Sequence, residues 1–141
     1  MAIKRFVASK DTTITNAFKS DLQTRATSSN MGASDSLEVF SIYGQTVDSA
    51  SSKTTELARI LIQFPMSDIS ASRETGDIPQ SGSVRFYLKM YNAVHPYTLP
   101  SDYTLTISAL TKSWEEGTGL DMEGFRDETY DQEGANWVNA S

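Results

Sequence analysis

The sequence of 141 residues is most constrained by a nearly continuous apolar run at residues 56–66. Read with a period of two, the run has one fully apolar face, formed by Ala58, Ile60, Ile62 and Phe64. The opposite face is only half apolar and includes Arg59. Such a short run with β-branched residues is typical of a strand covered on both faces, and Pro65 is expected to end it because proline cannot donate a ladder hydrogen bond. A short buried helix is the alternative, but the pattern favours the central strand of a sheet.

Four further stretches alternate apolar and polar residues and are expected to form strands, at residues 3–18, 37–43, 83–91 and 103–112. The third alternates most cleanly, and the side chains expected to face the core are Val84, Phe86, Leu88 and Met90. The connections are rich in Ser, Thr and Gly, which predicts long loops at residues 19–36, 45–55 and 67–82. No segment shows an apolar stripe of helical period. These features indicate an all-β fold in a single domain, residues 1–141, as an antiparallel β-sandwich or jelly roll.

Composition argues against several classes of function. The chain has no cysteine, which excludes disulfides and thiolate metal sites, and its single histidine, His95, is predicted to be a solvated loop residue. No apolar run approaches the length of about 18 residues needed to span a membrane, and the N-terminus lacks the apolar core of a secretory signal. The net charge of −6 argues against nucleic acid as a partner.

The negative charge is concentrated in an acidic, loop-rich C-terminal segment, residues 115–141, which contains eight Asp or Glu residues and one Arg. Its carboxylates include Asp121, Glu123 and Asp127, which are candidate oxygen ligands for Ca²⁺. Their spacing does not match an EF-hand loop, so the pattern favours a solvated acidic loop over a calcium site.

Glu115 and Glu116 could be interpreted as the carboxylate pair of a glycosidase. Adjacent residues on a strand or turn point apart, however, and cannot flank one glycosidic bond. The sequence therefore predicts no catalytic residues, no cofactor and a protein that is not an enzyme.

The outward face of residues 83–91 carries a cationic and aromatic stripe, formed by Arg85, Tyr87, Lys89 and Tyr91. Aromatic rings beside cations can dock a sugar ring or a protein partner. The same side chains could instead cover a sheet face beneath a second layer. The stripe and Trp137 are thus the predicted interaction surface, with a purely structural role as the alternative.

Several short motifs follow one another along the chain: Asp11-Thr12-Thr13-Ile14, Asn30-Met31-Gly32 followed by Leu37-Glu38-Val39, residues 59–64, residues 84–91 and Trp114-Glu115-Glu116-Gly117. In this order they resemble the domains named DNRLRE, which have an Arg-containing core strand and a Trp-x-Glu motif. The resemblance implies a jelly-roll-like β-sandwich whose architectural residues are Asp11, Asn30, Arg59, Trp114 and Glu115. A buried Arg59 would need a carboxylate or backbone carbonyls to offset its desolvation, and Glu115 or Asp11 is the candidate.

DNRLRE domains occur in carbohydrate-associated surface proteins and in structural proteins of tailed bacteriophages, and residues 119–121 and 134–137 look like those of large myophages. The resemblance implies a non-enzymatic virion protein, made in the host cytoplasm. It would assemble as a homo- or hetero-oligomer with other virion proteins on the head, neck or tail surface. A carbohydrate-binding module that recognises a surface glycan is the alternative. The family pattern continues beyond Asn136-Trp137, so the domain is expected to be incomplete and its edge covered by another chain or by sequence beyond Ser141.

Overall fold

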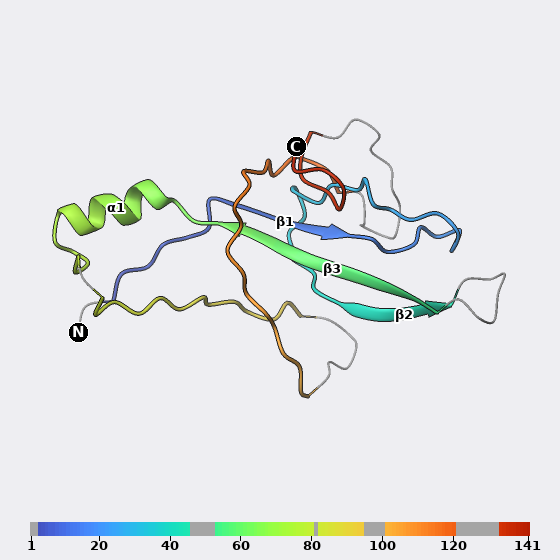
Figure 1. Ribbon diagram of the computed structural model, residues 1–141, viewed down its shortest axis with the longest axis horizontal. Helices are drawn as coiled ribbons and strands as arrows, with labels where there is room; N and C mark the ends of the chain where they lie inside the picture. The colour runs from blue at the N-terminus through green and yellow to red at the C-terminus, as the bar shows by residue number, and fades with distance from the viewer. Residues whose placement is uncertain (1–2, 46–52, 81, 95–100, 121–132) are drawn as a thin grey trace.

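The computed structural model describes residues 3–45, 53–80, 82–94, 101–120 and 133–141 (Figure 1). The described residues contain three strands and one helix: β1 (Lys10–Thr15), β2 (Ser41–Gln45), β3 (Lys53–Gln63) and α1 (Met66–Glu74). The strands form one antiparallel sheet in the order β1-β3-β2. The protein is thus a small all-β fold with one short helix, and the prediction that the apolar run forms the central strand is confirmed.

β3 is long enough to pair with a different strand along each half of its length. Its second half pairs with β1, in a register that places Thr13 opposite Ile60 and Thr15 opposite Ala58. Its first half pairs with β2, which begins at Ser41. The β-branched residues of β1 and β3 suit this extended, partly covered surface. β3 ends two residues before Pro65, as expected from the missing N–H of proline.

The core lies beside β1, and most of the buried residues are small or polar. Its apolar cluster consists of Ala17, Ala26 and Met31, with the half-buried Phe40 packed against it. The three threonines of β1 are buried: Thr12, Thr13 and Thr15. On the apolar face of β3 only Ala58 is buried, whereas Ile60, Ile62 and Phe64 are half-buried. The face expected to be fully covered is therefore partly open among the described residues.

This partial burial sets the expected effect of truncating Ile60. We expect Ile60→Ala to lower the free energy of unfolding by about 1–2 kcal/mol, below the 2–5 kcal/mol typical of fully buried sites, because part of the side chain already contacts solvent. Urea denaturation measures the change, and Gln63→Ala, at an exposed position of β3, is the control. A loss above about 3 kcal/mol would mean that this face is fully covered in solution.

Helix α1 begins at Met66 and covers the first half of residues 67–82, which the sequence predicted to be a loop, so the loop prediction is wrong there. The helix was missed because it has no apolar stripe: its one buried residue is Ser72, whose hydroxyl donates to the Asp68 carbonyl. Asp68 in the first turn and Arg73 in the last turn complement the helix dipole. Beyond the helix, Lys4 pairs with Asp77 at 2.7 Å, which lowers the pKa of Asp77 and ties the N-terminal segment to this end of the sheet.

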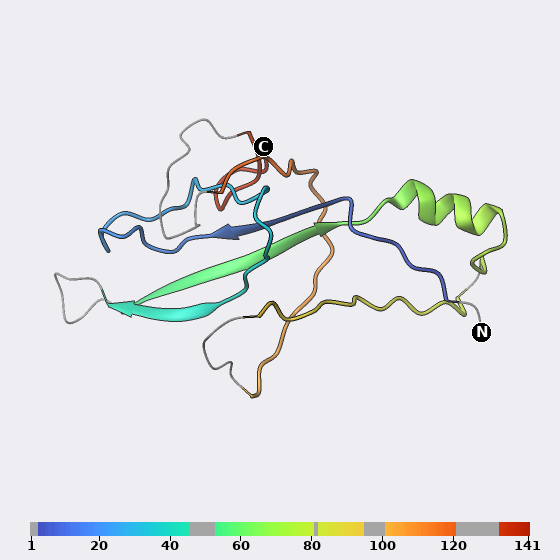
Figure 2. The ribbon, with the colours of Figure 1, turned by 180° about the vertical axis from the view of Figure 1, so that it is seen from behind.

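Several strand predictions also need correction. The strand expected at 3–18 is confined to β1, and the strand expected at 37–43 is shifted to β2, which continues to Gln45. Because β3 begins at Lys53, the loop expected at residues 45–55 is wrong at both of its ends. Residues 83–91 and 103–112 are in no strand. In both Figures 1 and 2 the described residues 83–94 are extended and run apart from the sheet. They and residues 101–113 share no backbone hydrogen bond with another described segment.

Candidate functional site

The most constrained position in the described structure is Asn30, whose side chain is completely buried at 0% exposure. Its amide N–H groups donate to the carbonyl oxygens of Glu116, at 2.8 Å, and Ala135, at 3.0 Å. Its amide oxygen accepts from the backbone N–H of Gly119, at 2.8 Å, and Gly32, at 3.2 Å. These four hydrogen bonds match the donor and acceptor capacity of one amide group, so Asn30 joins three segments that are far apart in sequence.

A glycine cluster surrounds the Asn30 side chain and consists of Gly32, Gly117, Gly119 and Gly134. A Cβ at Gly117 or Gly134 would collide with the Asn30 side chain, and both residues have positive φ, of 76° and 132°. A Cβ at Gly119 would collide with the Asn30 carbonyl. Only residues without a side chain let the three segments approach this closely.

The C-terminal residues 133–141 are held in the same unit by backbone pairing. The N–H of Ala135 donates to Glu115, and the N–H of Trp137 donates to Thr27. The Asn136 side chain accepts two backbone N–H groups and closes a local turn. In Figure 1 this segment, which includes the C-terminus, lies beside β1.

Residues 115 and 116 attach this unit to the sheet. Glu115 pairs with Lys10 at 2.8 Å, and the Glu116 carboxylate accepts the backbone N–H of Asp11 at 2.7 Å. Because β1 is an edge strand, this contact satisfies an N–H that the ladder leaves unpaired. The unit that Asn30 and the glycine cluster hold together therefore covers the β1 edge through Glu115 and Glu116.

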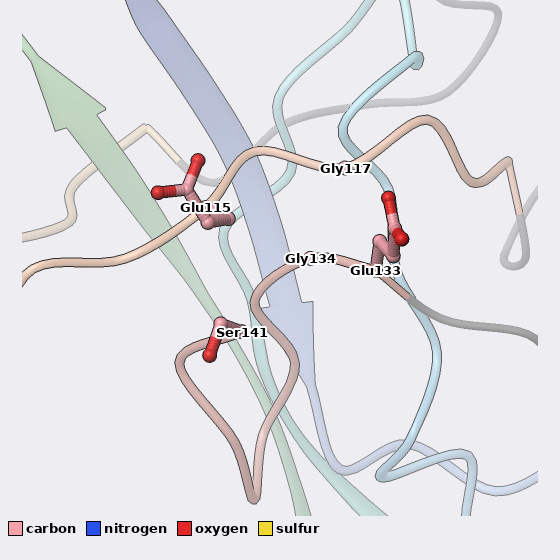
Figure 3. Close-up of a pocket in the computed structure, with 5 residues that line it drawn as sticks. All are labelled: Glu115, Gly117, Glu133, Gly134 and Ser141. Carbon is pink, nitrogen blue, oxygen red and sulfur yellow. The ribbon is translucent and has the colours of Figure 1, made fainter.

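A shallow pocket of about 430 Å³ lies in this unit and is lined by Glu115, Gly117, Glu133, Gly134 and Ser141 (Figure 3). Figure 3 shows the Glu115 carboxylate pointing away from Glu133, in keeping with its ion pair to Lys10. Two carboxylates that do not converge cannot act together across one bond. The described residues that line the pocket offer glycine backbone, separate acidic groups and the Ser141 hydroxyl, and among them no nucleophile is paired with a base.

The structure places Arg59 differently from the expectation of a buried, carboxylate-paired residue. Arg59 is exposed, and its guanidinium lies over the ring of Trp137 at 4.8 Å from the centroid. Glu115 pairs with Lys10 instead, and among the described residues no ion pair joins Arg59 to Asp11, so neither expected carboxylate partner is found. The cation–π contact keeps the guanidinium hydrated on one side, which avoids the desolvation cost that burial would bring. Trp114, in contrast, is buried.

The predicted interaction stripe is exposed at all four positions, Arg85, Tyr87, Lys89 and Tyr91. The Lys89 ammonium lies over the ring of Tyr91, 4.9 Å from its centroid. Trp137 is not brought to the stripe: its contacts are with Arg59 and Thr27. The opposite side of the same segment is also exposed, which contradicts the expected core-facing role of Phe86, Leu88 and Met90.

The calcium candidates Asp121, Glu123 and Asp127 lie outside the described residues, as does His95. Among the residues that the structure describes, no group of three or more His, Cys, Asp or Glu side chains could hold a metal ion. Within the same residues, no helix is long and apolar enough to cross a membrane.

The pKa of Asp21 is lowered by the backbone N–H groups of Thr24 and Gln23, which close a solvent-exposed turn far from the pocket in sequence.

Comparison with known proteins gives no further assignment. No protein-family model, no curated protein and no solved structure matches the chain. The resemblance to DNRLRE domains therefore stays a prediction from its motifs.

The sequence pointed to Asn30 only through that resemblance, and it did not reveal the role of Glu116 or of the glycine cluster. Their one sequence signal is the density of glycine near the Trp114 motif and before Trp137. Glycine density alone is typical of loops, so it could not indicate which residue the glycines surround.

Proposed function

We propose that the chain is a non-enzymatic structural protein of a tailed-bacteriophage particle, where it assembles with other virion proteins on the head, neck or tail surface. One observation supports assembly most strongly: residues 83–94 are extended and exposed on both sides although their sequence alternates like a half-buried strand. Exposed apolar side chains on an unpaired backbone suit a segment that completes its pairing with a partner.

The same observation supports a β-sandwich as the assembled architecture. The three-stranded sheet presents a partly open apolar face at Ile60, Ile62 and Phe64. Residues 83–94 and 101–113 have the alternation needed for strands of a second sheet. In this proposal the second sheet forms when a partner provides a strand with which these residues can form backbone hydrogen bonds.

Mass spectrometry of purified particles of the phage that encodes the chain tests the proposed function. Peptides from this protein are expected in particles that have been washed at high salt, in a constant ratio to the major capsid protein. Particles that infect normally and contain none of these peptides would overturn the proposal.

A carbohydrate-binding module is the second candidate, because the stripe presents two exposed tyrosine rings next to two cations. Aromatic faces can stack on sugar rings. Under this alternative, the isolated protein would bind a polysaccharide on a glycan array, and Tyr87→Ala would remove the signal. Binding that is unchanged in Tyr87→Ala would exclude the stripe as the glycan site.

A further inference from the structure

We infer that residues 84–92 form an antiparallel strand pair with the same residues of a second copy of this chain, with Leu88 on the two-fold axis. The inference rests on the proposed function, since it names the partner that completes the unpaired segment. Its evidence is the exposure of the segment, the chemistry of its two faces and the pairing that each possible register would produce.

The segment has the composition of a strand but lacks the burial of one. Phe86 is 63% exposed, Leu88 40% and Met90 48%, although the three residues occupy the apolar face of the pattern. On the opposite face Tyr87 is 80% exposed. An extended backbone that forms no ladder with the other described residues leaves its N–H and C=O groups available to another strand. Pairing would satisfy the backbone and cover part of both faces at once.

A register centred on Leu88 places complementary side chains opposite one another. On the polar face Arg85 faces Tyr91 of the second copy, and Tyr87 faces its Lys89. Each pair joins a cation to an aromatic ring, and by symmetry each occurs twice. The Tyr91 ring already accepts a cation within one chain, from Lys89. On the apolar face Phe86 meets Met90, and sulfur–aromatic contacts of this kind are favourable.

Neighbouring registers are poorer. A register centred on Tyr87 would place Arg85 opposite Lys89, and like charges directly opposite one another are destabilising. A register centred on Lys89 would place two copies of its ammonium group together. A shift by one residue would oppose apolar to polar side chains along the whole segment. Like-charge repulsion and face matching therefore both favour Leu88.

Residues 103–111 of the same chain are a less complementary partner. Their polar positions are threonines and serine, and they contain no charged residue and one aromatic residue, Tyr103. Pairing with them would leave Arg85 and Lys89 opposite hydroxyl groups or apolar side chains. A second copy of residues 84–92 instead offers two rings and two cations in the matching positions.

Single cysteine variants test the register, because the natural chain contains no cysteine. In Leu88→Cys the two thiols would lie directly opposite, with Cα atoms about 4.5–5.5 Å apart, which is within disulfide range. Mild oxidation of the full chain is expected to give a disulfide-linked dimer on non-reducing gels. Phe86→Cys and Met90→Cys are matched controls: each would lie roughly 13 Å from its own counterpart and should not cross-link alone. A mixture of these two variants should cross-link, because Phe86 of one copy faces Met90 of the other.

The pattern of cross-links decides the inference. Failure of both Leu88→Cys and the mixed pair to cross-link, or equal cross-linking of all three single variants, would overturn it. The mixed pair keeps the test valid if Leu88→Cys disturbs the segment. These results are separate from those of mass spectrometry. A chain that is present in particles but does not cross-link would contradict the pairing of residues 84–92 and leave the proposed function standing. A chain that cross-links as a dimer but is absent from particles would support the pairing and contradict the proposed function.

Discussion

Replacing Asn30 by alanine is expected to lower the free energy of unfolding by about 3–4 kcal/mol, the largest effect of any single substitution considered for this protein. The substitution removes four hydrogen bonds made by a side chain with no solvent exposure. The carbonyls of Glu116 and Ala135 and the N–H of Gly119 would be left without their partner. Water cannot replace the amide without opening the unit, so residues 133–141 should separate from β1.

Urea denaturation measures this change, and two further variants define its cause. Asn30→Asp keeps the shape but removes both donors and places a carboxylate beside two carbonyl oxygens, so it should be as destabilising as alanine. Asn139→Ala, in the same C-terminal segment but at an exposed position, should change stability by less than about 0.5 kcal/mol. A loss below about 1 kcal/mol for Asn30→Ala would show that the three segments are held together by something other than this amide.

Replacing Gly117 by alanine is expected to cost about 2–4 kcal/mol through two additive effects. Its φ of 76° lies in the left-handed region, which is unfavourable for a residue with a Cβ. The new methyl group would also collide with the Asn30 side chain and the Glu133 carbonyl. Since the backbone carbonyl has little freedom to move, relief must come from displacement of the C-terminal segment. Thermal and urea unfolding should both report the loss.

Gly82→Ala is the control for this prediction. Gly82 has no neighbour within 4 Å of the position where a Cβ would lie and does not have positive φ, so alanine there should be neutral or slightly stabilising. If Gly117→Ala were as stable as Gly82→Ala, the close approach of Gly117 to Asn30 would not exist in solution.

The sequence by itself determined the element that organises the sheet. The apolar run at residues 56–66 has β-branched residues and is interrupted at Pro65, and both of these properties are local. β3 accordingly includes this run up to Gln63, ends before the proline and occupies the centre of the sheet, although it begins earlier, at Lys53. Such features are predictable because they depend on neighbours in sequence.

Helix α1 and residues 83–94 show where local patterns fail. The helix has no apolar stripe because it packs through a single serine, so periodicity could not reveal it. Residues 83–94 have strong alternation, yet alternation indicates only that a strand could be half-buried. Whether a ladder forms depends on a partner at the correct distance, and among the described residues there is none.

The tertiary structure alone decided the roles of Arg59, Glu116 and the glycine cluster. A buried arginine needs a carboxylate or backbone carbonyls to offset its desolvation, but Arg59 avoids burial by lying over Trp137, which is 78 positions away in sequence. Asn30 and Gly119 meet across 89 residues. Contacts of this kind depend on where the chain returns in space, because hydrogen bonds and collisions act over a few ångströms regardless of sequence separation. For that reason the sequence could identify the central strand, while only the folded chain shows what covers the β1 edge.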